Sequence, residues 1–97
     1  MNMQAMLKQA QALQKDMLKV KDEVDNADFV GESSFVKITM KGTKKVVDVK
    51  INAESFDSED IEALQDMIML AYNQASDKVD KTMEEKMGKF GNIPGLF

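Results

Sequence analysis

The sequence predicts an α+β fold: a long N-terminal helix, a three-stranded antiparallel β-meander and a long C-terminal helix, in that order. Three observations predict it. Apolar residues recur at steps of three and four near the N-terminus, alternate with polar residues over positions 29–52, and return to helical spacing from position 61. These are the periods of amphipathic helices and half-buried strands. Ninety-seven residues fit one domain, which we assign to residues 1–88.

The first predicted helix covers residues 3–25. Its apolar residues follow the a/d heptad pattern of a coiled coil, and its interior lacks glycine and proline. At 1.5 Å per residue the helix is about 34 Å long. We call its apolar residues the heptad stripe and expect them to pack on another long helix or on a second copy of the chain. They are Met3, Met6, Ala10, Leu13, Met17, Val20 and Val24.

The alternative is that the heptad stripe packs only on the chain's own sheet. A three-stranded sheet is about 15–20 Å wide at a strand spacing of about 4.8 Å, so a 34 Å helix overhangs it. The N-terminal half of the stripe then needs other cover. The long C-terminal helix or a dimer mate can supply it.

The middle of the chain predicts a hairpin with a shorter strand, residues 29–32, before it. Gly42-Thr43 predicts a two-residue turn with glycine first. That turn sets Ile38 opposite Val47, and it sets Val36 opposite Val49. All four side chains then share one face, which needs a helix to cover it.

The last predicted helix begins near Asp57 or Ser58, either of which can cap it, and runs to Met87 with Gly88 as its C-cap. A break or bend near residues 76–77 is left open, because the apolar spacing changes there to steps of four. Residues 89–97 are rich in glycine and are expected to form a flexible tail.

The composition excludes several classes of function. The chain has no cysteine and no histidine, and no nucleophile motif or phosphate-binding glycine loop, so we expect neither an enzyme nor a small-molecule substrate. The acids of residues 54–62 lack the spacing of a calcium loop and fit the start of a helix better, so we expect no metal and no cofactor. No apolar run is long enough to span a membrane and no signal peptide is evident, so we expect a cytoplasmic protein.

The charges are unevenly distributed. The chain has 13 lysines, no arginine and 17 acids, for a net charge of −4, yet residues 1–21 carry four lysines and one acid. Lys8, Lys15 and Lys19 fall within about 40° of one another on a helical wheel, opposite the heptad stripe. Such lysines are either an ordinary solvated helix face or a ridge that contacts phosphates.

Eight segments of the sequence, taken in order and spacing, resemble one family. They are residues 6–11, 13–14, 36–42, 46–52, 61–66, 71–75, 85–88 and 94–96. On these segments the chain resembles the YbaB/EbfC family of bacterial nucleoid-associated proteins over nearly its whole length.

The resemblance implies a homodimer whose paired helices project from joined sheets like tweezers. It also implies binding of double-stranded DNA with little sequence preference, and a place in the nucleoid. The family's DNA contacts are attributed to the projecting helices. The matching positions here are Lys8, Gln11, Lys15, Lys19, Lys78, Lys81 and Lys86. The alternative function is a protein-interaction scaffold that uses methionine-rich helices to hold another protein.

Overall fold

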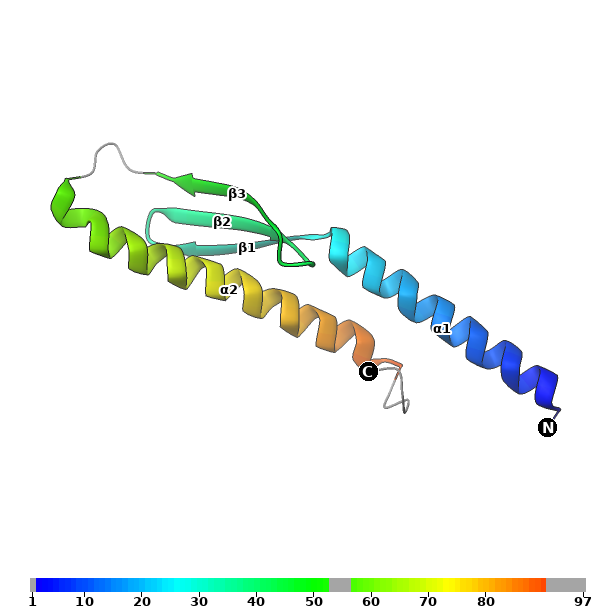
Figure 1. Cartoon of the computed structure of the whole chain (residues 1–97). Coiled ribbons are helices and arrows are strands. Elements are labelled where there is room, and N and C mark those ends of the chain that lie inside the picture. Colours follow the sequence, from blue (N-terminus) through cyan, green and yellow to red (C-terminus); the bar gives the residue numbers. More distant parts are fainter. Residues whose placement is uncertain (1, 53–56, 91–97) are drawn as a thin grey trace.

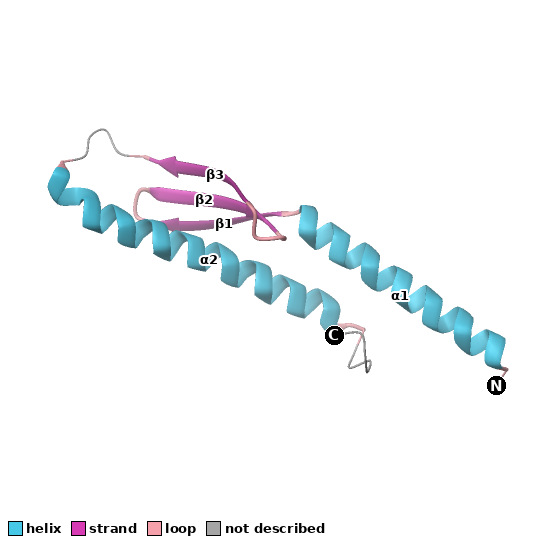
Figure 2. Cartoon of the chain, viewed as in Figure 1, coloured by secondary structure: helices cyan, strands magenta, loops and turns pink. Residues whose placement is uncertain are grey.

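The computed structural model describes residues 2–52 and 57–90. Helix α1 (Met3–Asn26) leads into strands β1 (Asp28–Ser33), β2 (Val36–Lys41) and β3 (Val46–Ile51). A short 3-10 turn, η1 (Ser58–Asp60), then opens helix α2 (Ile61–Gly88). The predicted α+β fold and element order are confirmed (Figures 1 and 2).

The molecule is elongated, with principal dimensions of 71 × 19 × 15 Å. The sheet lies along the first part of α2, and α1 extends away from the sheet beside the end of α2 (Figure 1). α1 and α2 run in opposite directions and overlap only in part, so the N-terminal half of α1 projects beyond the rest of the described chain.

Helix α1 begins where Asn2 caps it. The Asn2 Oδ1 atom accepts hydrogen bonds from the backbone N–H groups of Gln4 (2.7 Å) and Ala5 (3.2 Å), which satisfies two of the free donors of the first turn. The helix ends at Asn26, and Ala27 is already extended.

The heptad stripe is covered over only half of its length. Met17, Val20 and Val24 are buried, and α1 there packs on α2 and touches β2. Leu13 is half-buried, whereas Met3, Met6 and Ala10 are exposed. The overhang expected from the length of the helix is therefore present.

The sheet has the order β1-β2-β3, with antiparallel pairing throughout. The predicted hairpin register is wrong by two residues on β3: Val49 lies opposite Ile38, and Ile51 lies opposite Val36. A shift of two residues preserves which side chains share a face, so the predicted apolar face is retained.

A longer turn causes the shift. The backbone N–H of Lys44 donates to the carbonyl of Lys41 (2.8 Å), and the N–H of Lys41 donates to the carbonyl of Lys45 (2.9 Å). Lys44 adopts a left-handed conformation (φ 70°), so the turn does not depend on glycine for a positive φ. A bulge between Thr39 and Met40 adds the remaining offset.

Helix α2 is continuous from Ile61 to Gly88, without the break left open near residues 76–77. Its first turn is preceded by η1, where the Asp57 N–H donates to the Asp60 carboxylate (3.1 Å). Gly88 is the last helical residue rather than a left-handed cap, because Lys89 after it keeps a helical conformation (φ −64°).

Small residues of α2 allow the helix to lie close to the sheet. Ala71 and Ala75 are fully buried and face Gly31 of β1. The core continues with Val36 and Ile38 against Ala71, and with Met40 against Ala75. α2 covers β1 and β2 but not β3. Residues 91–97, most of the predicted tail, lie outside the described residues.

Candidate nucleic-acid interface

The outer face of α1 carries the three predicted lysines. Lys8, Lys15 and Lys19 are exposed, and their positions span about 16 Å along the helix axis at 1.5 Å per residue. Within the described residues, none of the three forms an ion pair or a side-chain hydrogen bond. Gln11 is also exposed and falls on the same side of the helix. We call Lys8, Gln11, Lys15 and Lys19 the lysine ridge.

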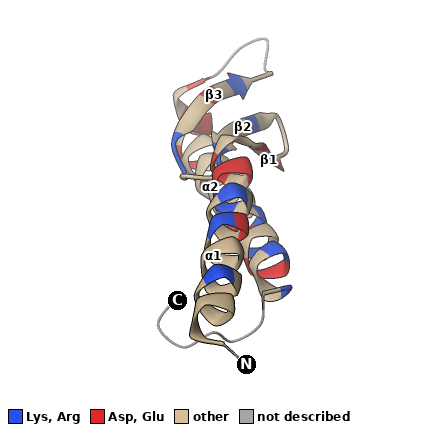
Figure 3. Cartoon of the chain, turned by 90° about the vertical axis from the view of Figure 1, so that its right-hand side faces the viewer, with Lys and Arg blue, Asp and Glu red and all other residues tan. Residues whose placement is uncertain are grey.

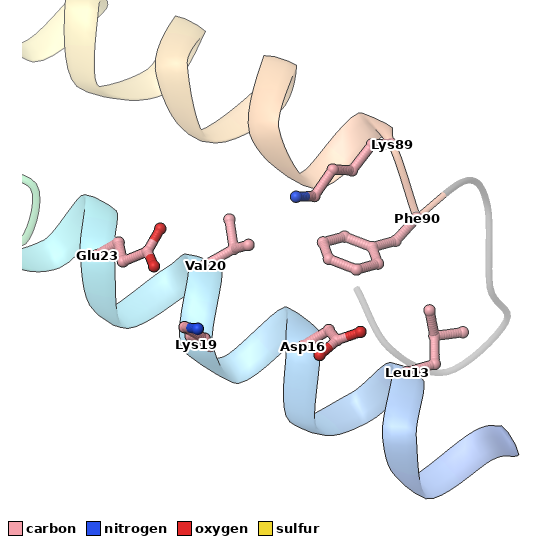
Figure 4. A pocket seen from close by; sticks show the side chains of 7 residues that line it. All are labelled: Leu13, Asp16, Lys19, Val20, Glu23, Lys89 and Phe90. Carbon is pink, nitrogen blue, oxygen red and sulfur yellow. The ribbon is translucent and has the colours of Figure 1, made fainter.

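The acid next to Lys15 in sequence does not neutralise the ridge. Asp16 borders a cleft between α1 and the end of α2, together with Leu13 and Phe90 (Figure 4). Lys19 lies at the edge of the same cleft. Within the described residues Asp16 forms no ion pair with a ridge lysine, and its position lies about 80° around the helix from Lys8.

Charge is segregated along α1. Residues 3–15 contain Lys8 and Lys15 and no acid, whereas the last turns contain Asp22, Glu23 and Asp25. The Lys21 ammonium is already paired with the Asp25 carboxylate at 2.7 Å. The positive part of the helix is therefore its projecting end, where no other described element lies over it (Figure 3).

The lysines of α2 differ from those of α1. Lys78 is exposed, but its Nζ donates a 2.7 Å hydrogen bond to the carbonyl of Val30 on β1. Lys81 and Lys86 are exposed and, five residues apart, point about 140° apart around the helix. Because α2 holds three lysines and six acids, its surface attracts phosphate less than the tip of α1.

Lys78 belongs to a contact that closes the outer edge of the sheet. One turn away, the Gln74 Oε1 atom accepts a 2.7 Å hydrogen bond from the backbone N–H of Glu32. Val30 and Glu32 are two residues apart on β1, so both groups point away from β2. The side chains of Gln74 and Lys78 thus occupy backbone groups that an edge strand otherwise leaves unpaired.

We predict that Lys78→Met lowers the free energy of unfolding by about 1 kcal/mol, because one hydrogen bond to the strand edge is lost while the aliphatic stem remains. Lys81→Met is the matched control, since the structure gives Lys81 no such bond, and is expected to stay within about 0.5 kcal/mol of the parent. Urea denaturation measures both. Equal stabilities for the two variants would contradict the role of Lys78.

The sequence did not reveal the structural roles of Lys41, Lys44 and Gly31, and it indicated only a turn at Gly42. Lys44 pairs with Asp80 of α2 (2.9 Å) and Lys41 with Asp28 (2.7 Å), so the hairpin turn is held by charge pairs. A Cβ on Gly31 would lie 1.9 Å from a backbone oxygen of α2, and one on Gly42 would lie 2.0 Å from the carbonyl oxygen of Val24. For Gly31, a lone glycine within a strand pattern is the signal for such an approach.

Comparison with known proteins identifies the family. A family model described as the YbaB/EbfC DNA-binding family matches residues 1–93. The chain belongs to this family. Relatives named "Nucleoid-associated protein" are 43% identical in Ligilactobacillus salivarius (99% of this chain, 95% of the relative) and 44% identical in Lactococcus lactis subsp. cremoris (93% of each). A relative from Streptococcus pneumoniae with the same name is 43% identical (97% of this chain, 98% of the relative).

A solved structure of another protein has the same fold as this chain. A crystal structure of a Helicobacter pylori protein superposes with a TM-score of 0.75 over 95% of this chain and 99% of that one, at 20% sequence identity. This likeness concerns the fold alone. Neither described helix is long and apolar enough to cross a lipid bilayer.

Proposed function

We propose that this YbaB/EbfC protein binds double-stranded DNA as a homodimer with little sequence preference and resides in the bacterial nucleoid, in the cytoplasm. The observation that carries the proposal is the lysine ridge. Its ammonium groups are exposed, have no ion pair within the described residues, and lie on a projecting helix that a duplex can approach. Phosphate contacts of this kind supply the sequence-independent part of DNA affinity.

Low sequence preference follows from the side chains that the ridge lacks. The chain has no arginine, so the bidentate arginine contact to guanine is absent. Gln11 is the one ridge residue able to read a base edge, through adenine. Lys81 and Lys86 contribute weaker contacts, while Lys78 remains engaged with β1.

The proposed dimer uses an apolar surface at the sheet end of the molecule. Val49 and Ile51 lie opposite Ile38 and Val36, so they point to the face that α2 covers elsewhere. Nothing in the described chain covers them, and Val49 is 49% exposed.

α2 adds to this surface. Tyr72 lies about 160° around α2 from Gln74, which marks the β1 side of the helix, so Tyr72 faces the β3 side. Ile61 and Met69 fall on the same side and are exposed. We call Val49, Ile51, Ile61, Met69 and Tyr72 the β3–α2 surface. If a second copy packs its own β3–α2 surface against this one, the two-fold arrangement buries both surfaces.

The two edges of the sheet differ in a way that favours this arrangement. Gln74 and Lys78 occupy the outer edge of β1, whereas α2 does not reach β3. Strand addition by a second copy is therefore directed to β3. Both projecting helices then lie away from the joined sheets.

The DNA proposal is tested by titrating salt against duplex binding. Three ridge lysines per chain, six per dimer, predict that log K falls against log[salt] with a slope of about −5. Duplexes of unrelated sequence are expected to bind within about tenfold of one another. A slope near zero, or no binding at ~50 mM salt, would overturn the proposal.

The dimer is tested by a charge placed in the β3–α2 surface. We predict that Val49→Lys sediments as a monomer, because a buried ammonium without a partner is costly at an interface. Leu18→Lys is the matched control: Leu18 is 61% exposed and lies on α1, outside the surface. A dimeric Val49→Lys would contradict the proposed interface.

A second candidate function is a protein-interaction scaffold. The observation that favours it is the uncovered apolar tip of α1, where Met3, Met6 and Leu7 are all exposed. Capture of a stoichiometric protein partner, without any mobility shift of duplex DNA at low salt, would select this function instead.

A further inference from the structure

The cleft between α1 and the end of α2 is where the described chain ends. It encloses about 510 Å³. Leu13, Val20 and Phe90 form its apolar part, and the half-buried ring of Phe90 faces α1 (Figure 4). The Phe90 N–H donates to the Met87 carbonyl (3.1 Å), so the end of α2 holds this residue against the cleft.

Beyond this cleft the heptad stripe continues, and no described element covers it. Met17 is 5% exposed and packed within the chain, whereas Met6 is 54% and Met3 80% exposed on the same side of the same helix. α2 ends beside the middle of α1 (Figure 1), so it cannot reach them. We call Met3, Met6 and Ala10 the apolar strip. The other residues at positions 3–12 include one lysine and no acid.

The segment that follows Phe90 has the chemistry to cover the strip. Residues 91–97 contain no charged side chain and include three large apolar residues, Ile93, Leu96 and Phe97. Extended, seven residues reach about 23 Å at ~3.3 Å each. The distance along α1 from Leu13 to Met3 is about 15 Å. The segment is therefore long enough to follow the strip to its end.

We propose that residues 91–97 dock on Met3, Met6 and Ala10 of the same chain, entering through the cleft at Phe90. The same chain is favoured over a second copy because α2 delivers the segment to the cleft, which gives it a high effective concentration there. The docking surface lies on the opposite side of α1 from the lysine ridge and at the far end from the β3–α2 surface. The proposal thus stands whether or not the chain binds DNA or dimerises.

The test uses a single fluorescent reporter. The chain has no tryptophan, so Phe97→Trp introduces the only one. We expect blue-shifted emission and about twofold weaker acrylamide quenching than in a free peptide of residues 91–97, because the strip covers one face of the indole. Adding Met6→Lys is expected to restore the emission and quenching of the free peptide.

Met69→Lys is the matched control, because Met69 is 58% exposed and lies on α2 near the sheet. Both lysines replace exposed side chains, and far-ultraviolet circular dichroism verifies that the helices persist. As a second readout without tryptophan, the ε-methyl resonances of Met3 and Met6, but not of Met69, are expected to shift when the chain is cut after Phe90.

Three outcomes would overturn the proposal. One is solvent-exposed emission from Phe97→Trp together with unchanged Met3 and Met6 resonances in the shortened chain. Another is shifted emission that Met6→Lys leaves untouched, which places the segment elsewhere. The third is recovery of shifted emission when the Phe97→Trp/Met6→Lys chain is mixed with an excess of parent chain, which assigns docking to a second copy.

Discussion

Gly31→Ala is expected to abolish the native packing of α2 on the sheet. The new Cβ would lie 1.9 Å from the Ala71 carbonyl oxygen and 2.8 Å from the Ala75 nitrogen. Both obstacles are backbone atoms of a continuous helix, so no side-chain rotation relieves the clash. Overpacking by one methyl group in a core that can adjust costs about 1–3 kcal/mol. Here we expect more than about 3 kcal/mol, which is a large part of the stability of a domain of this size.

Gly88→Ala is the matched control for Gly31→Ala. A Cβ at Gly88 meets no atom of the described residues within 4 Å, and the residue is helical. Alanine has the higher helix propensity, so the change is expected to be neutral or stabilising by up to about 1 kcal/mol. Urea denaturation followed by circular dichroism measures both variants. A Gly31→Ala protein as stable as the parent would mean that α2 does not lie this close to β1.

The sequence could predict the elements of the fold, but not the register of β3 or the close packing of α2 on β1. Periods of 3.6 and 2 revealed both helices and all three strands, because apolar side chains recur on one face of each element. The register of β3 was not accessible, since it depends on the left-handed conformation of Lys44 and on a bulge. The change to steps of four in α2 was not a break; it brings Ala71 and Ala75 over Gly31.

The candidate site was predictable to a similar extent. Helical spacing alone grouped Lys8, Lys15 and Lys19. The structure places them exposed on one side of α1, with no ion pair to another described residue. The hydrogen bond of Lys78 to Val30 was not predictable. It joins residues 48 positions apart, and no local pattern distinguishes an exposed lysine from one that reaches a strand edge.

The combined change of Lys8, Lys15 and Lys19 to glutamate is expected to weaken duplex binding by at least about 10³-fold at ~50 mM salt, because six phosphate contacts per dimer become repulsive. The three residues are exposed, and glutamate is a good helix former, so α1 is expected to stay folded. Changing them to glutamine removes the attraction without adding repulsion. We expect that variant to bind weakly, with a slope of log K against log[salt] much shallower than about −5, because only the weaker contacts of Lys81 and Lys86 remain.

The decisive comparison is with Lys45, Lys81 and Lys86 changed together to glutamate. These residues are also exposed and unpaired within the described chain, so the two triple variants have the same net charge. If the ridge is the main contact surface, the second variant loses only the weaker contacts of Lys81 and Lys86. Its affinity is then expected to fall far less than that of the ridge variant, and most of the slope of about −5 to remain. If only net charge matters, both variants lose equal affinity, and that result would contradict a localised DNA interface on α1. Because the proposed contact surface is one projecting helix rather than the whole molecule, we expect the two variants to differ clearly in affinity.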